Sequence, residues 1–204
     1  MTSSVVLWWL PVGAGGHVVR HTSAWWERVE AARARRPPRP LFHAALEVTV
    51  DGARYVIEMA PEWGGPRTAD RGVVRTGAVG SRFLGRSRFF RYEVRCWRDG
   101  VLPDRDWAEG GPLTLARDPA VARALLAGVP RVPALTWGRS VEGDMWNSNS
   151  LVAWALVIAG IDTADLRPPG GGRAPGWYAG LAVAREPGLA RDDRPGRFRG
   201  KGRS

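Results

Sequence analysis

Runs of apolar residues separated by turn residues dominate the first half of the chain. Runs of about four to eight apolar residues bounded by Gly, Pro or Asp are typical of buried strands. The dipeptide Asp51-Gly52 lies between two such runs and is a preferred turn of a two-residue β-hairpin. The strands that we predict are Val5–Val12, Leu41–Val50, Arg54–Ala60, Arg71–Val79, Arg88–Gly100 and Trp177–Ala184.

Three further segments have the composition and spacing of helices. Asp118 is a good N-cap for a helix that begins at Pro119, because proline suits the first helical position. Gly160 is a typical C-terminal stop for a helix that begins at Ser150, where apolar residues recur at helical spacing. The helices that we predict are Ser23–Arg36, Pro119–Ala127 and Ser150–Ala159.

The order of these elements indicates the fold class. Most strands come early and one substantial apolar helix comes late, which predicts an α+β fold with a largely antiparallel sheet packed against helices. A chain of 204 residues can form one good hydrophobic core. We therefore predict a single globular domain over residues 1–184 and a disordered basic tail over residues 185–204, where Gly, Pro and Arg replace apolar periodicity.

The net charge of +10 is concentrated in two peripheral stretches. Residues 20–39 hold six arginines against two glutamates, and residues 185–204 hold six arginines and one lysine against three acidic residues. That lysine is the only one in the chain, and an arginine bias of this kind is what a GC-rich genome produces without functional pressure. A solvated surface is therefore favoured, and nucleic acid is an unlikely partner. A protein that binds nucleic acid through its arginines is a less favoured hypothesis about function, and its binding should weaken steeply with salt.

Residues that carry redox or metal chemistry are few. Cys96 is the single cysteine, which excludes an internal disulfide and a CxxC metal site. Acidic residues and histidines do not cluster at metal-ligand spacing, so we predict no metal and no cofactor. Apolar runs fall short of the ~18 residues that a membrane helix needs, and the N-terminal run lacks the flanks of a signal peptide. We therefore expect a cytoplasmic protein with no membrane partner.

The polar sequence Asn147-Ser148-Asn149-Ser150 precedes the late apolar helix. Ser and Asn are the best N-caps, so one interpretation is that these residues only cap the helix. A helix N-terminus also offers unpaired N–H groups and a partial positive charge, which suit a nucleophile and a developing oxyanion. Ser148 is then the candidate nucleophile, with N–H groups around Asn149 as oxyanion donors. Both interpretations stay open.

His43 is the candidate general base for Ser148. The other two histidines, His17 and His21, lie in an early loop region, whereas His43 lies near the start of a predicted strand. A histidine beside apolar residues in a strand is also commonly a structural side chain. The residue alone does not separate these two interpretations.

Glu58 is the candidate partner of His43. It is the acidic residue in the otherwise apolar run VIEMA of the second hairpin strand. If the two strands pair outward from Asp51-Gly52, Glu58 faces Ala45 and lies diagonal to His43, within reach of a carboxylate–imidazole bond. An embedded carboxylate is costly without a partner, which supports this pairing.

These three residues, in this order, resemble the pattern of circularly permuted papain-like hydrolases. That group includes permuted NlpC-type peptidases, the lecithin retinol acyltransferase type and the deubiquitinating PPPDE type. The resemblance covers roughly residues 41–60 and 144–160, and it implies a papain-like fold in which His43 is the base, Glu58 the orienting residue and Ser148 the nucleophile. The families carry cysteine where this chain has serine.

A second resemblance rests on two longer motifs. The strings GDMWNSNS and GRAPGWYAGLAVA are similar to motifs of a family of uncharacterised bacterial proteins in which both recur with serine. This resemblance extends over most of the chain and implies no activity.

Serine in place of cysteine leaves two hypotheses. Serine cannot rest as an anion and must lose its proton during attack, but Ser-His-acid sets are defined by geometry rather than by fold. The first hypothesis is therefore a hydrolase or acyltransferase acting on an amide, peptide or ester bond of a small molecule or peptide. The alternative is a catalytically inactive papain-like scaffold that serves as a binding module. The residues expected to line the binding cleft are Trp146, Asn147, Asn149, Arg173 and Trp177. For Arg173, an ion pair with a carboxylate such as Asp144 is equally open.

Overall fold

The computed structural model describes residues 3–13, 27, 31–33, 35–62, 71–102 and 105–190. The helix predicted over Ser23–Arg36 lies mostly outside these residues, although Glu27 and residues 31–33 are helical. His17, His21 and the part of the basic tail beyond Ala190 also lie outside them.

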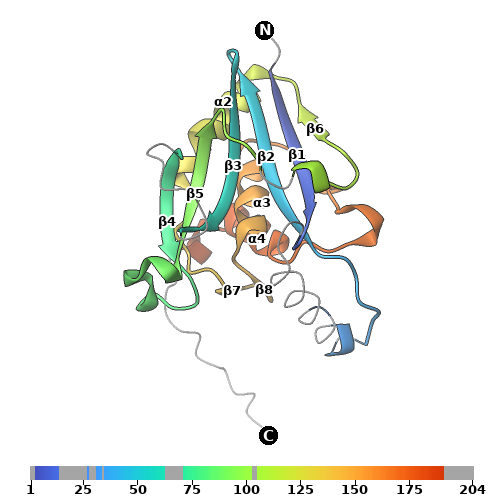
Figure 1. The fold of residues 1–204 in the computed structure, drawn as a ribbon, viewed down its shortest axis with the longest axis vertical. Coiled ribbons are helices and arrows are strands. Elements are labelled where there is room, and N and C mark those ends of the chain that lie inside the picture. Colours follow the sequence, from blue (N-terminus) through green and yellow to red (C-terminus); the bar gives the residue numbers. More distant parts are fainter. Residues whose placement is uncertain are drawn as a thin grey trace, which may run out of the picture.

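Six strands form one sheet in the order β4-β5-β3-β2-β1-β6 (Figure 1). Each neighbouring pair in this sheet is antiparallel. A separate two-stranded ribbon pairs β7 with β8. The strands are β1 (Ser4–Pro11), β2 (Phe42–Val50), β3 (Ala53–Pro61), β4 (Val73–Ala78), β5 (Arg91–Arg98), β6 (Leu113–Ala116), β7 (Ser140–Val141) and β8 (Asp144–Met145).

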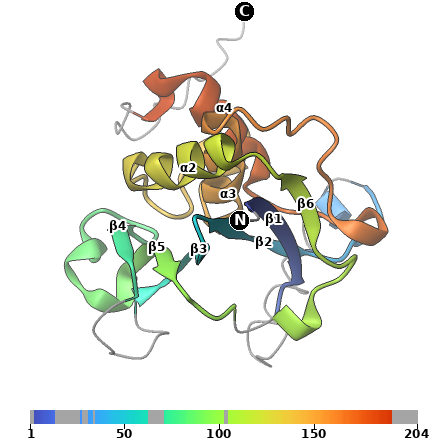
Figure 2. The ribbon, with the colours of Figure 1, turned by 90° about the horizontal axis from the view of Figure 1, so that it is seen from above.

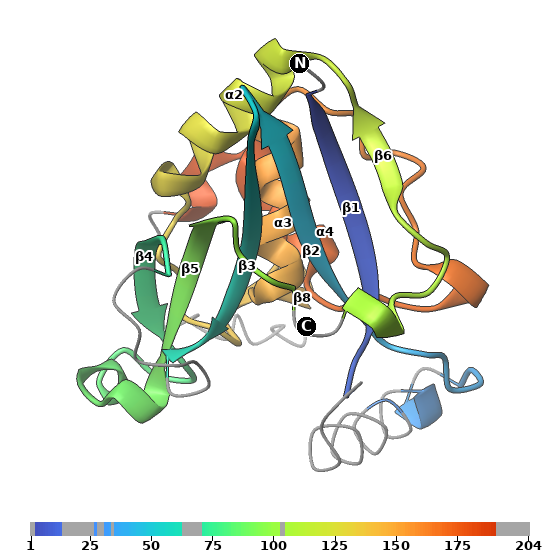
Figure 3. The ribbon, with the colours of Figure 1, turned by 45° about the horizontal axis from the view of Figure 1, so that its top comes forward.

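Three α-helices lie together on one side of the sheet (Figure 2). They are α2 (Pro119–Gly128), α3 (Ser148–Ile158) and α4 (Trp177–Arg185). Helix α3 packs against β2 and β3, α2 packs beside it over β1 and β2, and α4 packs against α3. Figure 3 shows α3 running along the back of the central strands. The predicted α+β class with a mostly antiparallel sheet is confirmed.

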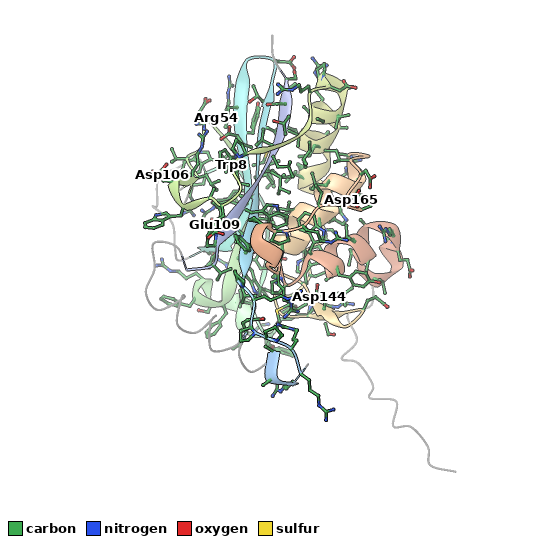
Figure 4. All side chains as sticks on the ribbon, turned by 90° about the vertical axis from the view of Figure 1, so that its right-hand side faces the viewer. Trp8, Arg54, Asp106, Glu109, Asp144 and Asp165 are labelled. Carbon is green, nitrogen blue, oxygen red and sulfur yellow. The ribbon has the colours of Figure 1, made fainter. Side chains whose placement is uncertain are left out.

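The main core lies between the sheet and the helices. Strand β2 contributes Phe42, Leu46 and Val48 to it, all fully buried. The opposite face of the sheet carries a smaller apolar cluster that includes Trp8, and Figure 4 shows Trp8 and Arg54 on the side away from the helices. Because both faces are covered, β2 is apolar along most of its length rather than strictly alternating.

The hairpin between β2 and β3 has the predicted turn. Asp51 and Gly52 have φ values of 53° and 79°, the left-handed conformation that a type I′ turn requires at both central residues. The register pairs Val50 with Ala53 as predicted, and the ladder continues to the pair Leu46–Ile57. There the described ladder between β2 and β3 ends, although β3 keeps pairing with β5 as far as Pro61.

The strand predicted over Trp177–Ala184 is wrong, because this segment forms helix α4. The carboxylate of Asp144 accepts N–H bonds from Gly176 and Tyr178 at 2.9 and 3.2 Å, which caps the first turn of the helix (Figure 4). A short apolar run fits a strand and a buried helix equally well, so the sequence pattern could not separate them.

Other elements differ in their limits. Helix α3 begins at Ser148, two residues before the predicted start, and strand β6 and the β7–β8 ribbon were not predicted. Beyond residue 184, α4 ends at Arg185 and a 3₁₀ turn follows at Pro187–Ala190, so regular structure continues into the first residues of the predicted tail. Among the described helices, none is long and apolar enough to cross a membrane.

Candidate active site

The start of helix α3 is held by a capping box. Asn147 is the N-cap, and its Oδ1 accepts the main-chain N–H of Asn149 at 2.9 Å. Ser150 accepts the main-chain N–H of Asn147 on its Oγ at 3.0 Å, which closes the box. The Ser150 hydroxyl also donates to the carbonyl of Gly176 at 2.7 Å and so links α3 to the start of α4.

Asn149 takes the place of a neighbouring strand beside β2. Its Oδ1 accepts the N–H of Ala44 at 2.7 Å, and its Nδ2 donates to the carbonyl of Phe42 at 3.0 Å. The same Nδ2 donates to the carbonyl of Pro175 at 2.8 Å. The Ala44 N–H and the Phe42 carbonyl lie beyond the last pair of β2 with β3. Either group would cost about 1–3 kcal/mol of stability if it were buried without a hydrogen-bond partner. The Asn149 amide therefore clamps the main chain on both sides of His43.

Ser148 is the member of this polar sequence that faces His43. Its Oγ lies 2.8 Å from Nδ1 of the imidazole, across a separation of 105 positions in the chain. Ser148 is buried and His43 is half-buried. The structure thus brings together the hydroxyl at the N-terminus of the buried helix and the imidazole at the start of β2, as the sequence analysis expected.

Burial lowers the pKa of His43 from 6.5 to about 4. The imidazole is therefore neutral at neutral pH, the state in which a ring nitrogen can accept the serine proton. The nitrogen that faces Ser148 is Nδ1, so the base-ready tautomer carries its proton on Nε2. This is the reverse of the arrangement in the serine-protease template.

The expected oxyanion donors are only partly available. The N–H of Asn149 is bonded to the N-cap side chain. The N–H of Ser148, in the first turn of α3, has no acceptor among the described residues. The first N–H groups of a helix lack intrahelical partners and carry partial positive charge, so the Ser148 N–H is the better placed donor.

Glu58 lies in the same pocket as His43, but its carboxylate also belongs to an ion-pair network. Oε1 of Glu58 accepts a hydrogen bond from Arg95 at 3.0 Å. Arg95 also donates to Glu93, which in turn pairs with Arg71. Glu58 is 8% exposed and Arg95 5% exposed, so the pair is buried in the sheet. The predicted partner of Glu58 was His43, and Arg95 was not foreseen.

A pocket of about 510 Å³ opens beside Ser148 and His43. Its volume falls within the range of roughly 300–1,000 Å³ that is usual for small-molecule sites. The pocket lies where β2 and β3 separate, and it receives residues from both strands, from the end of β1 and from the start of α3. The lining residues besides Ser148, His43 and Glu58 are Leu10, Pro11, Val12, Gly13, Leu41, Phe42, Met59, Ala60, Pro61, Trp137, Asn147, Asn149 and Pro175.

Two of the five residues expected to bind substrate line this pocket, namely Asn147 and Asn149. Their side-chain amides already bond to protein groups. Trp146 is fully buried in the main core, and Trp177 packs against Trp9 with a centroid separation of 5.1 Å. These two indoles support the pocket region without lining it.

Arg173, the fifth of these residues, holds the chain together through both its side chain and its backbone. Its Nη1 pairs with Glu27 at 3.0 Å. Its carbonyl accepts the N–H of Phe42 at 2.8 Å, so residue 173 extends the sheet beside β2. An ion pair of this arginine with a carboxylate was anticipated, but its partner is Glu27, whereas Asp144 caps α4.

Trp137 and Pro175 line the pocket although they are not among the five residues expected to bind substrate. Trp137 lies in the segment WGR, and its indole packs on Tyr92 with a centroid separation of 6.0 Å. Its main chain pairs with the end of β4 and the residues just beyond it, with bonds to Ala78 and Gly80. The isolated tryptophan in a Gly-containing loop was the available signal, but only the tertiary pairing shows that it reaches the pocket.

Groups suited to metal or thiol chemistry add little to the site. Within the described ranges, no cluster of three or more His, Cys, Asp or Glu side chains could hold a metal ion. Cys96 is half-buried in β5, and burial raises the pKa of its thiol to about 11. A thiol with that pKa is protonated at neutral pH and is a poor nucleophile.

The fold and the pocket define an α+β protein with a serine–histidine pair at the N-terminus of a buried helix. Comparisons with models of protein families, with curated proteins and with solved structures found no match to this chain.

Proposed function

We propose that the chain is a hydrolase or acyltransferase with a permuted papain-like fold, which acts on an amide, peptide or ester bond through Ser148. The observation that carries the proposal is the 2.8 Å contact between Ser148 Oγ and His43 Nδ1 at the wall of the pocket. A helix that presents its first residue to a histidine on a central strand also supports the papain-like architecture.

The proposed chemistry begins with attack of Ser148 Oγ on the substrate carbonyl carbon. His43 Nδ1 takes the hydroxyl proton, and the carbonyl oxygen becomes an oxyanion beside the Ser148 N–H. The carbon–heteroatom bond then breaks, and the leaving group receives the proton from His43. Water, or an acceptor alcohol or amine, then cleaves the serine ester by the same steps in reverse.

Glu58 is the proposed orienting carboxylate for His43. It lines the same pocket and extends from the neighbouring strand. A carboxylate near Nε2 would favour the tautomer in which Nδ1 is free to accept the serine proton. Its ion pair with Arg95 would hold the carboxylate in one position.

A fluorophosphonate probe tests the proposal, because it reacts with serines that a base activates. The wild-type protein should be labelled at neutral pH, and Ser148→Ala should lose the label. Ser140→Ala, at an exposed serine of β7, is the matched control and should keep it. Absence of labelling from pH 6 to pH 9 in a protein with native circular dichroism would remove the catalytic proposal.

A second candidate function is an inactive papain-like scaffold that binds a ligand. The low pKa of His43 favours it, because a base whose pKa is about 4 accepts a proton weakly. The pairing of Glu58 with Arg95 favours it as well, since the arginine competes with His43 for the carboxylate. For such a scaffold, Ser148→Ala keeps full ligand affinity and the wild type is not labelled.

A further inference from the structure

The polar side chains in the pocket wall leave little capacity for recognising a polar substrate. Both ends of the Asn147 amide are bonded, its Oδ1 to the Asn149 N–H and its Nδ2 to the Pro175 carbonyl. Both ends of the Asn149 amide are bonded as well. Glu58 is paired with Arg95. Ser148 and His43 thus remain as the polar side chains that face the cavity with a reactive role.

The other residues that line the pocket, among those the structure describes, have apolar side chains. Several of the apolar side chains are half-buried, so they present surface to the cavity instead of being covered by other protein groups. They come from five parts of the chain that converge on the gap between β2 and β3. These partly exposed apolar residues are Pro11, Val12, Leu41, Ala60, Pro61, Trp137 and Pro175.

We infer that the pocket binds an uncharged, apolar acyl group whose carbonyl carbon lies at Ser148. A charged or strongly polar acyl group would lose its water without gaining hydrogen bonds from this wall, which is costly. An apolar chain gains from each methylene that leaves water. This inference rests on the proposed function for the reacting bond and names the substrate class of that site.

A series of p-nitrophenyl esters tests the inference on the full chain. We expect kcat/KM to rise about fourfold for each methylene from acetate to octanoate, because each buried methylene contributes transfer free energy. The hemisuccinate ester, which adds a carboxylate at the length of a short acyl chain, should react at least tenfold more slowly than the butyrate ester. Equal or faster reaction of the hemisuccinate would overturn the inference.

Val12→Glu places a carboxylate on the apolar wall without changing the serine–histidine pair. It should flatten the dependence of kcat/KM on acyl chain length. Val101→Glu is the matched control, since Val101 is 64% exposed and lies outside the pocket lining, and it should keep the wild-type dependence. An unchanged chain-length series in Val12→Glu contradicts an apolar acyl site at this wall.

Binding to Ser148→Ala separates this inference from the catalytic proposal. Octanamide, a neutral uncleaved analogue, should bind this variant with a negative heat-capacity change, and succinamate should not. Octanamide binding without any serine labelling of the wild type would support the apolar pocket and refute catalysis. Labelling of the wild type together with a preference for succinamate would support catalysis and refute the apolar pocket.

Discussion

Ser148 is set apart from its neighbours by the hydrogen bonds that those neighbours make. Asn147 and Ser150 form the capping box, and Asn149 binds the edge of β2. The hydroxyl of Ser148 is therefore not needed for capping, and it faces His43. Within the sequence Asn147–Ser150, Asn147 and Ser150 cap the helix, whereas Ser148 contacts the imidazole.

The stability of the protein should depend on the protonation of His43. Its pKa is about 4 in the folded state, against an ordinary histidine value of 6.5 in the unfolded chain. Between these values the unfolded chain binds the proton more tightly, so the free energy of unfolding falls as the pH decreases from 6.5 towards 4. Urea unfolding of the wild type and of His43→Gln, at several pH values over this range, measures the difference.

The variant has no imidazole, so its free energy of unfolding should vary less with pH over that interval. Titration of carboxylates away from His43 affects both proteins alike and cancels in the comparison. Parallel pH dependences for the two proteins would show that His43 is not neutralised by burial.

Asn149 should position the serine–histidine pair as well as stabilise the fold. In Asn149→Asp the side chain loses both Nδ2 hydrogen bonds and, when ionised, directs a negative charge at two carbonyl oxygens. We expect a loss of about 2–4 kcal/mol in the free energy of unfolding at pH 7. Fluorophosphonate labelling of Ser148 should be lost at pH 7 and partly recovered at pH 5, where a protonated carboxyl can donate one hydrogen bond.

Asn149→Leu is the control, because it cannot titrate. It should be destabilised and poorly labelled at both pH values. If Asn149→Asp and Asn149→Leu show the same pH dependence of labelling, the amide has no positioning role beyond stability.

At the scale of elements, the contact between α3 and α4 determines where helix α3 lies. Ser150 donates to the carbonyl of Gly176, and Gly180 lies directly against the main chain of α3. Helix α4 thus supports α3 through its first turns. The absence of a side chain at Gly180 allows the two helices to approach closely.

Gly180→Ala should disrupt this contact. The added Cβ would lie 2.2 Å from the carbonyl oxygen of Ser150. Atoms cannot come this close, so the backbones of the two helices would have to move apart. We expect the free energy of unfolding to fall by about 1–3 kcal/mol, as measured by chemical denaturation. Gly188→Ala, where nothing lies within 4 Å, should stay within about 0.5 kcal/mol of the wild type. Equal effects of the two substitutions would contradict the tight packing of α4 on α3.

At the scale of the whole molecule, the sheet opens between β2 and β3 and the pocket occupies the opening. The ladder ends at the pair Leu46–Ile57, and beyond it the Asn149 amide and the main chain of Arg173 pair with β2 instead. On the β3 side, Arg95 holds Glu58 at the pocket wall. The site therefore depends on contacts from three distant parts of the chain.

Arg95→Met should be strongly destabilising. It leaves Glu58 and Glu93 without their shared cation, and breaking a buried ion pair costs about 3–5 kcal/mol. Arg123→Met is the control, since it removes the exposed pair with Asp51, and it should destabilise the protein far less because solvent screens that pair. Chemical denaturation of both variants measures their free energies of unfolding. A small loss of stability in Arg95→Met would show that the ion-pair network contributes little to the fold.

The hairpin and the helices with clear caps were predictable because their signals are local. Asp51-Gly52 determined the turn and the register as far as Leu46–Ile57, and Asp118-Pro119 determined the start of α2. Helix α4 was not predictable from its pattern, because its apolar and small residues suit either structure and its capping carboxylate lies in β8. The partners of Glu58 and Arg173 were not predictable either, since a charged side chain can reach several opposite charges.

The sequence by itself determined the α+β class, the hairpin register and the small set of candidate site residues. Periodicity, capping and turn chemistry depend on neighbours along the chain, so they can be read without coordinates. Tertiary structure alone decided that Ser148 faces His43, that Asn149 replaces a strand and that Glu58 pairs with Arg95. Those outcomes depend on contacts between residues far apart in the chain, and such contacts form only when the sheet and helices pack together.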